Sequence, residues 1–475
     1  MNHSSRPRLA KLALGLTLGL LFTLSPALAL KAEWRDADVN GDSKNEKVAV
    51  TNLADVALNT QGQIVGWYPK QVRGTDFKGN YNGKLNLVRP GVPLPGTLSG
   101  FTSPQAEFTQ APNGNKGGKL TATFTQGDAK LTYVIDPLFL SLEVSVESDS
   151  PRVLSWSGIG GTDRPLTKWL TPGNTQPTES GSGKPVYVAW QHSPTKGYAM
   201  VVQPVQGFDQ AKLARSPSGD SATLEISAPA GQATTFRAYG GFNEMVRLHV
   251  ERYLELPGLF NPDIWGRLSL ALLWVMEQGH RWTGSWFFGI VLLTLIVRLL
   301  LWPLMHQQYK SMAEMNKIQP LIQEINKKFK DNPEKRTEAT MKLYQEHKIN
   351  PFAGCLPLFL QLPVLFVLWK VIANYEFGQG VLWIPDLALP DPFYILPILY
   401  ILTTLASTYL SAAGNPDALR QGMIMNLVFV FFIFSFPSGV SIYWILSMVI
   451  TLAQQWLIKR SLGDLKPATA NAKSK

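Results

Sequence analysis

Five long apolar segments in the C-terminal half of the chain limit most strongly the folds open to it. An apolar helix of about 20 residues crosses the roughly 30 Å of hydrocarbon in a membrane. The fourth segment is short, and Pro437-Ser438-Gly439 predicts a tight turn that joins it to the fifth in a hairpin. The sequence therefore predicts a multi-pass α-helical membrane core with transmembrane helices at 285–304, 352–373, 393–412, 422–436 and 440–457.

A shorter apolar stretch, expected as a helix at 262–280, precedes these segments. Its apolar run ends at Glu277 and is too short to cross the hydrocarbon. Arg267 lies near its start, and His280 and Arg281 lie near its end, so that both ends are polar. We expect an interfacial helix that lies along the outer surface of the membrane.

The charges of the connecting segments predict the orientation of this core. Segment 306–350 carries nine Lys and Arg residues, whereas loop 374–392 carries none and contains three acidic residues. Lys and Arg concentrate in cytoplasmic loops. The sequence thus predicts a protein of the cytoplasmic (inner) membrane, with 306–350 and a short basic tail at 461–475 in the cytoplasm. Charged residues make up only 16% of the chain, as expected for a membrane protein, and the net charge of +10 suits anionic lipid.

The N-terminal segment 1–30 is expected to be a signal peptide or a signal-anchor helix. Arg6, Arg8 and Lys11 precede a short apolar stretch, and Ala27-Leu-Ala29 matches a cleavage site. The uncharged run is also long enough for an uncleaved anchor. Both interpretations place residue 31 onward outside the cytoplasm.

Residues 31–250 are expected to form an extracytoplasmic all-β domain, followed by the membrane core at 251–460. Short segments with alternating apolar residues recur between Gly- and Pro-rich turns, for example 119–124 and 131–135. Such spacing is typical of an antiparallel β-sandwich.

The sequence gives no support for a catalytic, metal or cofactor site. The six histidines have no ligand spacing, and the single Cys355 allows no internal disulfide. Asp36, Asp38 and Asn40 begin a calcium-loop pattern, but Lys47 stands at the twelfth position, where glutamate is needed. We therefore expect no covalent chemistry and no cofactor.

The cytoplasmic segment 306–350 is expected to be a helical hairpin. Apolar residues recur at helical spacing up to Phe329, Asp331-Asn332-Pro333 breaks the helix, and a second helical stretch follows. The segment is either a solvated loop packed on itself or a docking element for a partner. Its length and charge favour docking.

Arg298 lies inside the first transmembrane segment, where an arginine costs about 2.5 kcal/mol or more. Thr294 shares its helix face, one turn earlier. No carboxylate lies within the five predicted spans, which favours a hydrated cavity over a buried ion pair. The alternative is that Arg298 snorkels to lipid phosphates at the cytoplasmic end.

The membrane half of the chain resembles the YidC membrane-protein insertase family, in its larger form with an extracytoplasmic β-domain. The resemblance runs from about 262 to 460 and includes Leu293-Thr-Leu-Ile-Val-Arg-Leu-Leu-Leu-Trp-Pro-Leu304, Gln308-Tyr-Lys-Ser-Met-Ala313, Ile318-Gln-Pro320, Asn350-Pro-Phe-Ala-Gly-Cys-Leu-Pro357, Gln361-Leu-Pro363, Phe436-Pro-Ser-Gly439 and Tyr443-Trp444.

This resemblance implies an insertase and chaperone for newly made membrane proteins, with an amphipathic groove open to cytoplasm and lipid. Arg298 would be the positive residue of the groove, and Thr294, Gln361 and Tyr443 would be its polar lining or substrate contacts. The implied partners are nascent membrane proteins, membrane lipid and, through 306–350, the Sec translocon and a ribosome or targeting receptor. No sequence-specific nucleic acid is expected.

Two other classes of protein remain as alternatives. A small-solute transporter or channel would predict inverted repeats or paired broken spans, and the sequence contains no convincing internal repeat. A scaffold with a passive membrane anchor would have no use for Arg298 or for the charged hairpin.

Overall fold

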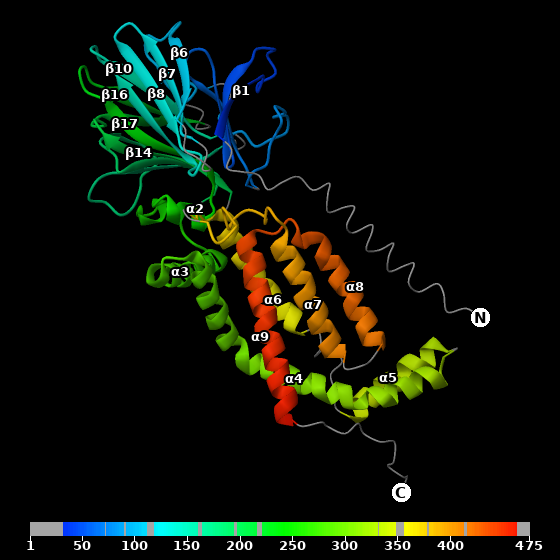
Figure 1. The fold of residues 1–475 in the computed structure, drawn as a ribbon. Coiled ribbons are helices and arrows are strands. Elements are labelled where there is room, and N and C mark those ends of the chain that lie inside the picture. Colours follow the sequence, from blue (N-terminus) through cyan, green and yellow to red (C-terminus); the bar gives the residue numbers. More distant parts are fainter. Residues whose placement is uncertain are drawn as a thin grey trace. The chain divides into compact units, whose positions relative to one another are not determined.

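The computed structural model describes residues 32–462 except 72, 90–91, 112–117, 160–163, 194–196, 216–220, 331, 348–355, 378–379 and 413–415. The predicted leader at 1–30, Cys355, most of the 350–357 motif and nearly all of the tail lie outside the described residues. The chain divides into two compact units, with the boundary between Arg267 and Leu268. The first unit is built of β-strands and the second of helices (Figure 1).

The first unit contains three antiparallel sheets. The four-stranded sheet has the order β1-β2-β3-β4, with strands Ala32–Ala37, Glu46–Thr51, Ala54–Leu58 and Ile64–Pro69. The five-stranded sheet has the order β12-β15-β16-β10-β5, with strands Gly181–Gly183, Ala211–Arg215, Ala222–Ala228, Arg152–Ser157 and Thr97–Leu98. The eight-stranded sheet has the order β11-β13-β14-β17-β9-β8-β7-β6, with strands Leu166–Leu170, Tyr187–Gln191, Tyr198–Gln206, Thr234–Phe242, Ser141–Glu147, Ala129–Ile135, Leu120–Gln126 and Gln105–Gln110.

Alternating side chains explain how these strands build a β-sandwich. In β7, the alternate residues Leu120, Ala122 and Phe124 are buried and lie opposite equally buried residues of β8. The two larger sheets meet at Trp156 of β10, whose ring lies 5.3 Å from that of Phe236 in β17. The apolar alternation in the sequence thus becomes one buried face on each sheet.

The small sheet carries a buried ion pair. Lys70 Nζ lies 2.7 Å from Asp55 Oδ1, and both side chains are at most 2% exposed. Tyr81 Oη donates to Asp55 Oδ2 at 3.1 Å, and Lys70 also donates to the Thr51 carbonyl at 2.5 Å. Burial raises the pKa of the Asp55 carboxyl above its ordinary value, while the charge of Lys70 acts to lower it. Each charged group is therefore held inside a closed hydrogen-bonded cluster.

After the last strand, the chain forms the helix α2 (Met245–Val250) and the short 3₁₀ turn η2 (Tyr253–Glu255). The helix α3 (Ile264–Thr283) corresponds to the predicted interfacial helix, and it exposes Trp265, Trp274 and Trp282. The remaining helices are α4 (Trp286–Lys328), α5 (Pro333–Glu346), α6 (Leu356–Asn374), α7 (Ile395–Ala412), α8 (Pro416–Ile433) and α9 (Ser438–Leu462). Helix α9 contacts α4, α6 and α7.

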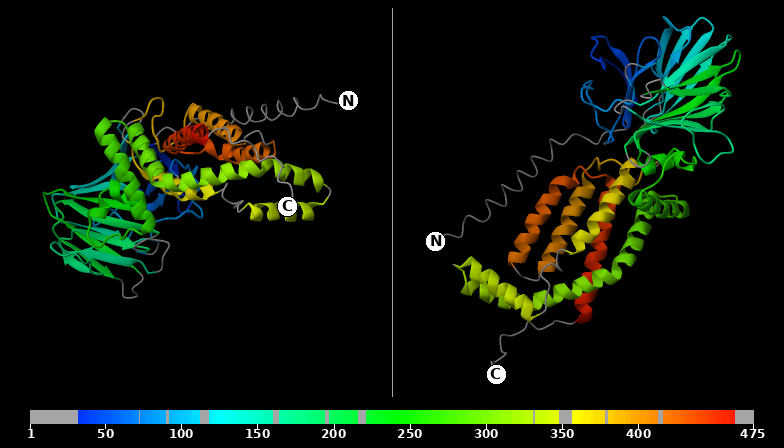
Figure 2. Two further views of the ribbon diagram at one scale, coloured as in Figure 1. Left: turned by 90° about the horizontal axis from the view of Figure 1, so that it is seen from below. Right: turned by 180° about the vertical axis from the view of Figure 1, so that it is seen from behind.

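Helix α4 departs from the sequence expectation of a span ending at 304 and a separate hairpin arm. It is one helix of 43 residues that continues through Pro303 and Pro320. A proline removes one main-chain hydrogen bond and bends a helix, but the turns on either side can hold it together. The ribbon of α4 bends along its length, and α5 packs back against its distal part (Figure 2).

The length and apolar character of the helices support fewer membrane spans than the five predicted from the sequence. Within the described residues, one helical segment, Trp286–Leu304, is long and apolar enough to cross a membrane. Three shorter apolar segments accompany it, at Gln361–Asn374, Ile395–Leu410 and Ser438–Gln454. The fold thus has a membrane-type helical unit, and the number of its spans stays a prediction.

Candidate functional site

Arg298 lies on α4 with its side chain against α9, and the residue is only 6% exposed. Its Nη2 donates to the main-chain carbonyl of Ser447 at 2.7 Å. The same carbonyl accepts a hydrogen bond from Thr451 Oγ1 at 2.9 Å. A helix carbonyl has two lone pairs, and a charged donor makes one of the stronger hydrogen bonds available to it. The guanidinium is therefore anchored to the neighbouring helix.

Thr294 lies one helical turn before Arg298 and is fully buried. Its hydroxyl donates to the carbonyl of Ile290 in the same helix, at 2.7 Å. Threonine commonly makes this local bond inside helices. Thr294 thus contributes a hydroxyl oxygen, which can still accept hydrogen bonds, to the face that carries Arg298.

Gln361 and Tyr443 join α6 to α9. Gln361 Nε2 donates to Tyr443 Oη at 2.8 Å, and Tyr443 is fully buried. Tyr443 lies one helical turn before Ser447, the residue whose carbonyl accepts from Arg298. The structure therefore brings Arg298, Gln361 and Tyr443 together from three helices, while Thr294 stands one turn away along α4.

Three further polar residues of α9 belong to the candidate site around Arg298, and the sequence patterns had not pointed to them. Ser447, Thr451 and Gln454 follow Tyr443 at helical spacing, and we call these four residues the polar strip of α9. Ser447 and Gln454 are buried, and Gln454 Oε1 makes no hydrogen bond within the described part of the chain. Polar residues recurring every turn in an apolar segment were the available signal.

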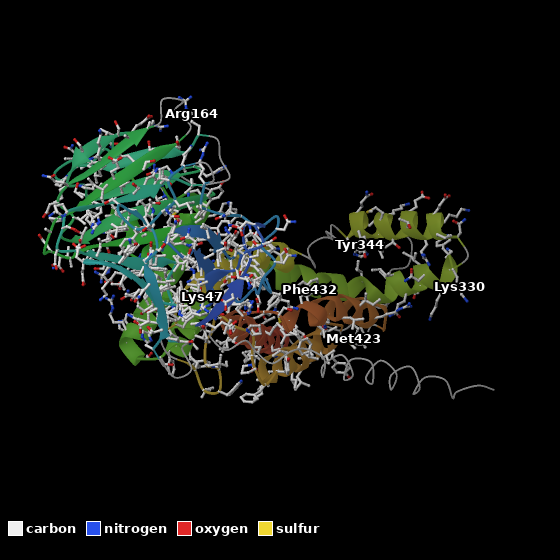
Figure 3. All side chains as sticks on the ribbon, turned by 90° about the horizontal axis from the view of Figure 1, so that it is seen from above. Lys47, Arg164, Lys330, Tyr344, Met423 and Phe432 are labelled. Carbon is white, nitrogen blue, oxygen red and sulfur yellow. The ribbon has the colours of Figure 1, made fainter. Side chains whose placement is uncertain are left out.

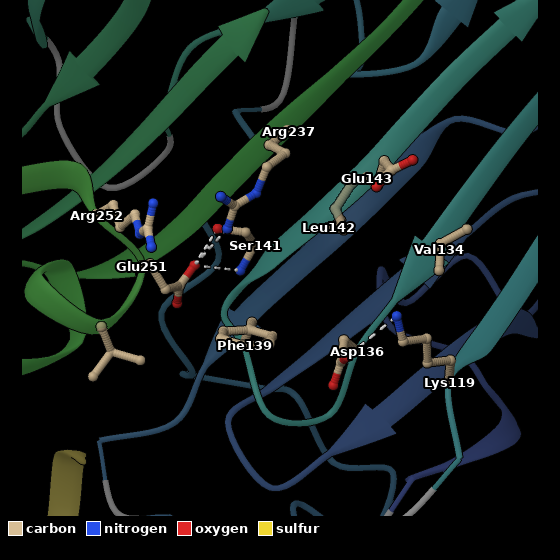
Figure 4. A pocket seen from close by; sticks show the side chains of 11 residues that line it. Lys119, Val134, Asp136, Phe139, Ser141, Leu142, Glu143, Arg237, Glu251 and Arg252 are labelled. Atoms are coloured by element: carbon tan, nitrogen blue, oxygen red, sulfur yellow. Dashed lines mark hydrogen bonds and ion pairs between the residues drawn. The ribbon is translucent and has the colours of Figure 1, made fainter. Parts of the chain in front are cut away.

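A second candidate site is a cavity of about 330 Å³ in the β unit (Figure 4). Its buried Glu251 accepts hydrogen bonds from Leu140 N at 2.9 Å and from the Ser141 main-chain N–H and hydroxyl. Burial raises the pKa of Glu251 above its ordinary value. Arg237 lies 3.9 Å from this carboxylate, and Lys119 lies 3.6 Å from Asp136. The charged side chains of the pocket therefore largely pair with one another. No cluster of metal-ligating residues occurs in the described chain.

The comparisons with known proteins agree on one family. The family described as "60Kd inner membrane protein" matches residues 278–464. A relative from Deinococcus radiodurans, named "Membrane protein insertase YidC", is 37% identical over 346 residues, which cover 70% of this chain and 79% of that protein. A relative of the same name from Geobacter sulfurreducens is 33% identical over 307 residues, which cover 62% of this chain and 56% of that protein.

A solved structure has a similar fold along nearly the whole chain. It is titled "Active YidC insertase crystal structure with the first transmembrane domain resolved", and the match covers 94% of this chain and 98% of that one. The TM-score is 0.58 at 22% sequence identity, so this likeness bears on the fold alone. Together with the relatives, it confirms the resemblance seen in the sequence. The chain belongs to the YidC family of membrane protein insertases.

Proposed function

We propose that this chain inserts newly made proteins into the cytoplasmic membrane through a hydrophilic groove that runs along the polar strip of α9 beside Arg298. The observation that carries the proposal is the buried Gln454 Oε1 of the polar strip, which makes no hydrogen bond with any residue that the structure describes. In an apolar environment such atoms cost free energy unless water or another polar group reaches them. The place of Gln454 on the helix that holds the buried Arg298 guanidinium supports a hydrated path.

The groove would act by physical means. A substrate whose short polar end must cross the membrane pays mainly for desolvation of that end. Water along the polar strip lowers this cost, and the charge of Arg298 attracts acidic residues in the polar end. The apolar segment that follows then partitions into lipid by the hydrophobic effect.

The proposed topology has five transmembrane helices, with α3 on the outer surface. Loop charge supports it, because the segment between α4 and α6 is rich in Lys and Arg while 374–392 contains neither. Exposed apolar side chains on α7 and α8 also fit contact with lipid, for example Leu402, Tyr409 and Leu427. In this arrangement 306–350 and the C-terminal tail are cytoplasmic, and residues 31–250 are extracytoplasmic.

The hairpin of α4 and α5 is the proposed docking element for the Sec translocon and for a ribosome or targeting receptor. Asn332 caps α5, since its Oδ1 accepts from Lys335 N at 3.0 Å, and Pro333 occupies the first turn. Ile318 and Leu343 are buried in the hairpin, while most other described side chains of α5 are exposed. Lys330 lies at its distal turn, and Tyr344 lies on α5 (Figure 3). The continuous helix α4 would connect this element directly to the groove.

The test of the groove is reconstitution into liposomes with a substrate that has a short acidic tail. Arg298→Ala and Arg298→Glu should lower the insertion of that substrate, measured by protease protection, and Arg298→Lys should retain most of it. Arg420→Ala, an exposed arginine on α8, is the matched control. Insertion unaffected by both Arg298→Ala and Arg298→Glu would sink the groove-charge mechanism.

The test of docking is deletion of 309–348. The shortened chain should still insert a purified substrate that reaches the liposome unaided, but it should lose insertion from ribosome-bound nascent chains. Equal insertion from both sources would show that the hairpin is a passive loop.

A further inference from the structure

The segment 381–394, between α6 and α7, holds two hydrophobic side chains in backbone conformations that such residues rarely adopt. Leu382 has φ of 52° and Tyr394 has φ of 58°. The other described non-glycine residues with positive φ are polar and lie in the β unit: Ser43, Lys78 and Arg252. Positive φ favours glycine or asparagine, because a Cβ atom crowds the backbone there. A leucine kept at such a place is an outlier that points to a role.

Leu382 stands at the tip of a tight turn. Val381 N donates to the Ile384 carbonyl at 2.8 Å, and Ile384 N donates back to the Val381 carbonyl at 2.9 Å. Val381 and Ile384 are buried, whereas Leu382 is 85% exposed. A two-residue turn of this kind normally takes glycine, asparagine or aspartate at its positive-φ position. The turn thus directs its one strained apolar side chain outward.

The segment that carries this turn is fastened to the helical unit. The Leu389 carbonyl accepts from both the main-chain N–H and the hydroxyl of Ser438, at 2.8 and 2.7 Å. Gly439 N donates to the Leu387 carbonyl at 3.0 Å. These bonds attach the segment to the first turn of α9. Leu382 therefore belongs to a segment that is hydrogen-bonded to the start of α9.

Asp391 links this turn to the start of α7. The buried carboxylate accepts from Trp383 Nε1 at 3.0 Å, from Phe393 N at 3.0 Å and from Leu396 N at 2.7 Å. One side chain thereby positions both the residue after Leu382 and the residue before Tyr394. Phe393 is 65% exposed. The hydrogen bonds of Asp391 thus fix the chain next to two exposed apolar side chains, Leu382 and Phe393.

The residues around Leu382 and Phe393 indicate that lipid covers this surface. Beyond Phe393, α7 exposes Ile395, Ile398 and Leu402, which share one face by their spacing and would face lipid in the proposed topology. The two aspartates of the segment are buried, and 381–394 contains no Lys or Arg, so its exposed surface is largely apolar. Tryptophan, here Trp383, is enriched where membrane meets water. This surface is a continuation of a lipid-facing helix.

We propose that Leu382 and Phe393 insert into the outer leaflet of the phospholipid bilayer and set the depth of the outer ends of α6 and α7. The strain at Leu382 is retained because only an apolar side chain at that position reaches the acyl chains. This proposal rests on the topology proposed above and is independent of the groove and of Arg298.

The depth of position 382 can be measured directly in vesicles. Full-length protein with Cys355→Ser and Leu382→Cys is labelled with an environment-sensitive fluorophore and reconstituted into phosphatidylglycerol and phosphatidylethanolamine. We expect the fluorophore to be quenched at least twofold by lipids with a nitroxide high on the acyl chain and to resist quenching by external iodide. The same label at Asn82, an exposed residue of the β unit, should show the opposite pattern. Iodide quenching at 382 without nitroxide quenching would overturn the proposal.

A second experiment changes position 382 without placing a label there. Leu382→Gly should raise the unfolding midpoint in detergent by about 2 °C, because glycine relieves the positive φ. A fluorophore attached through Phe393→Cys, in the Cys355→Ser background, reports the depth of position 393. Its nitroxide quenching should be at least halved when Leu382→Gly is added. An unchanged or lower midpoint would show that Leu382 is not held at a cost. Unchanged depth at 393 would show that Leu382 does not anchor the loop. Neither readout requires insertion activity, so each can fail while the insertase proposal stands.

Discussion

Each of the two units buries a cation, and the two cations are held in different ways. In the β unit, Lys70 lies 2.7 Å from the Asp55 carboxylate, whose other oxygen accepts from Tyr81. In the helical unit, Arg298 donates to the main-chain carbonyl of Ser447 and stands beside the polar strip of α9. The first arrangement is closed by a matching charge, and the second lies against a helix that carries Gln454 Oε1, a buried atom without a hydrogen-bond partner in the described chain.

Under the groove proposal, this difference separates a structural charge from a charge that acts on a substrate. A closed pair stabilises the fold only while both members are present, since removal of one strands the other. The bond from Arg298 to the Ser447 carbonyl joins a charge to a main-chain dipole, and under the groove proposal this charge acts on an incoming anion. The proposal therefore predicts that two cations of comparable burial respond differently to replacement.

The largest expected effect is on the closed pair. Lys70→Met should destabilise the β unit by about 3–5 kcal/mol, because it leaves the Asp55 carboxylate buried without its cation. Urea denaturation of the full-length protein in detergent, followed by hydrogen exchange of β2 to β4, measures this. Lys47→Met is the matched control, since Lys47 forms an exposed pair with Asp36 worth at most about 1 kcal/mol. Equal losses in the two variants would contradict the comparison.

The same variant should respond to pH. Burial already raises the pKa of Asp55 in the folded state, and loss of Lys70 removes a group that lowers it. The folded variant then binds a proton more tightly than the unfolded chain, so its stability falls as pH rises through the folded pKa. The cost of Lys70→Met should therefore be smaller at pH 4.5 than at pH 8. A larger cost at pH 4.5 would be the wrong sign for this mechanism.

Arg298→Met should affect insertion more than stability, whereas Lys70→Met affects stability. Arg298→Met should slow insertion of a substrate with an acidic tail about tenfold, or about 1.4 kcal/mol. Its effect on unfolding should stay within about 1 kcal/mol, because the lost hydrogen bond is offset by relief of desolvation. Insertion assays and thermal unfolding of the same preparation measure the two effects. A stability loss as large as that of Lys70→Met would make Arg298 structural.

The polar strip itself should show a smaller effect of the same kind. Gln454→Leu removes a buried oxygen that lacks a partner in the described chain, so stability should hold or rise by about 1 kcal/mol. Insertion should fall about threefold if that oxygen helps to hydrate the groove, a difference of about 0.6 kcal/mol. Leu452→Ala, at another position of the same helix, tests whether any change in α9 slows insertion. Faster or unchanged insertion by Gln454→Leu would remove the strip from the mechanism.

The smallest expected effect concerns the link between α6 and α9. Tyr443→Phe removes the acceptor of Gln361 and should lower stability by about 0.5–1 kcal/mol. Gln361→Leu together with Tyr443→Phe should cost less than the sum of the two single changes, as a double-mutant cycle of unfolding midpoints would show. Additive costs would mean that the two side chains do not act together.

Local properties of the sequence by themselves determined much of this protein. The alternation in 119–124 and 131–135 corresponds to β7 and β8, and the apolar segment at 285–304 closely matches the one helical segment of the described chain that is long and apolar enough to cross a membrane. The motifs around Arg298 identified the family. Strand formation and membrane partition depend on side chains close together in the chain, so the sequence carries them directly.

Only the tertiary structure decided which faces meet. Periodicity places Tyr443, Ser447 and Gln454 on one face of α9, but it does not say that Arg298 of α4 lies against that face. Nor does it reveal that Lys70 and Asp55 pair across the small sheet, or that α4 continues through Pro303. These outcomes depend on packing between segments far apart in the chain, and local spacing contains no information about that packing.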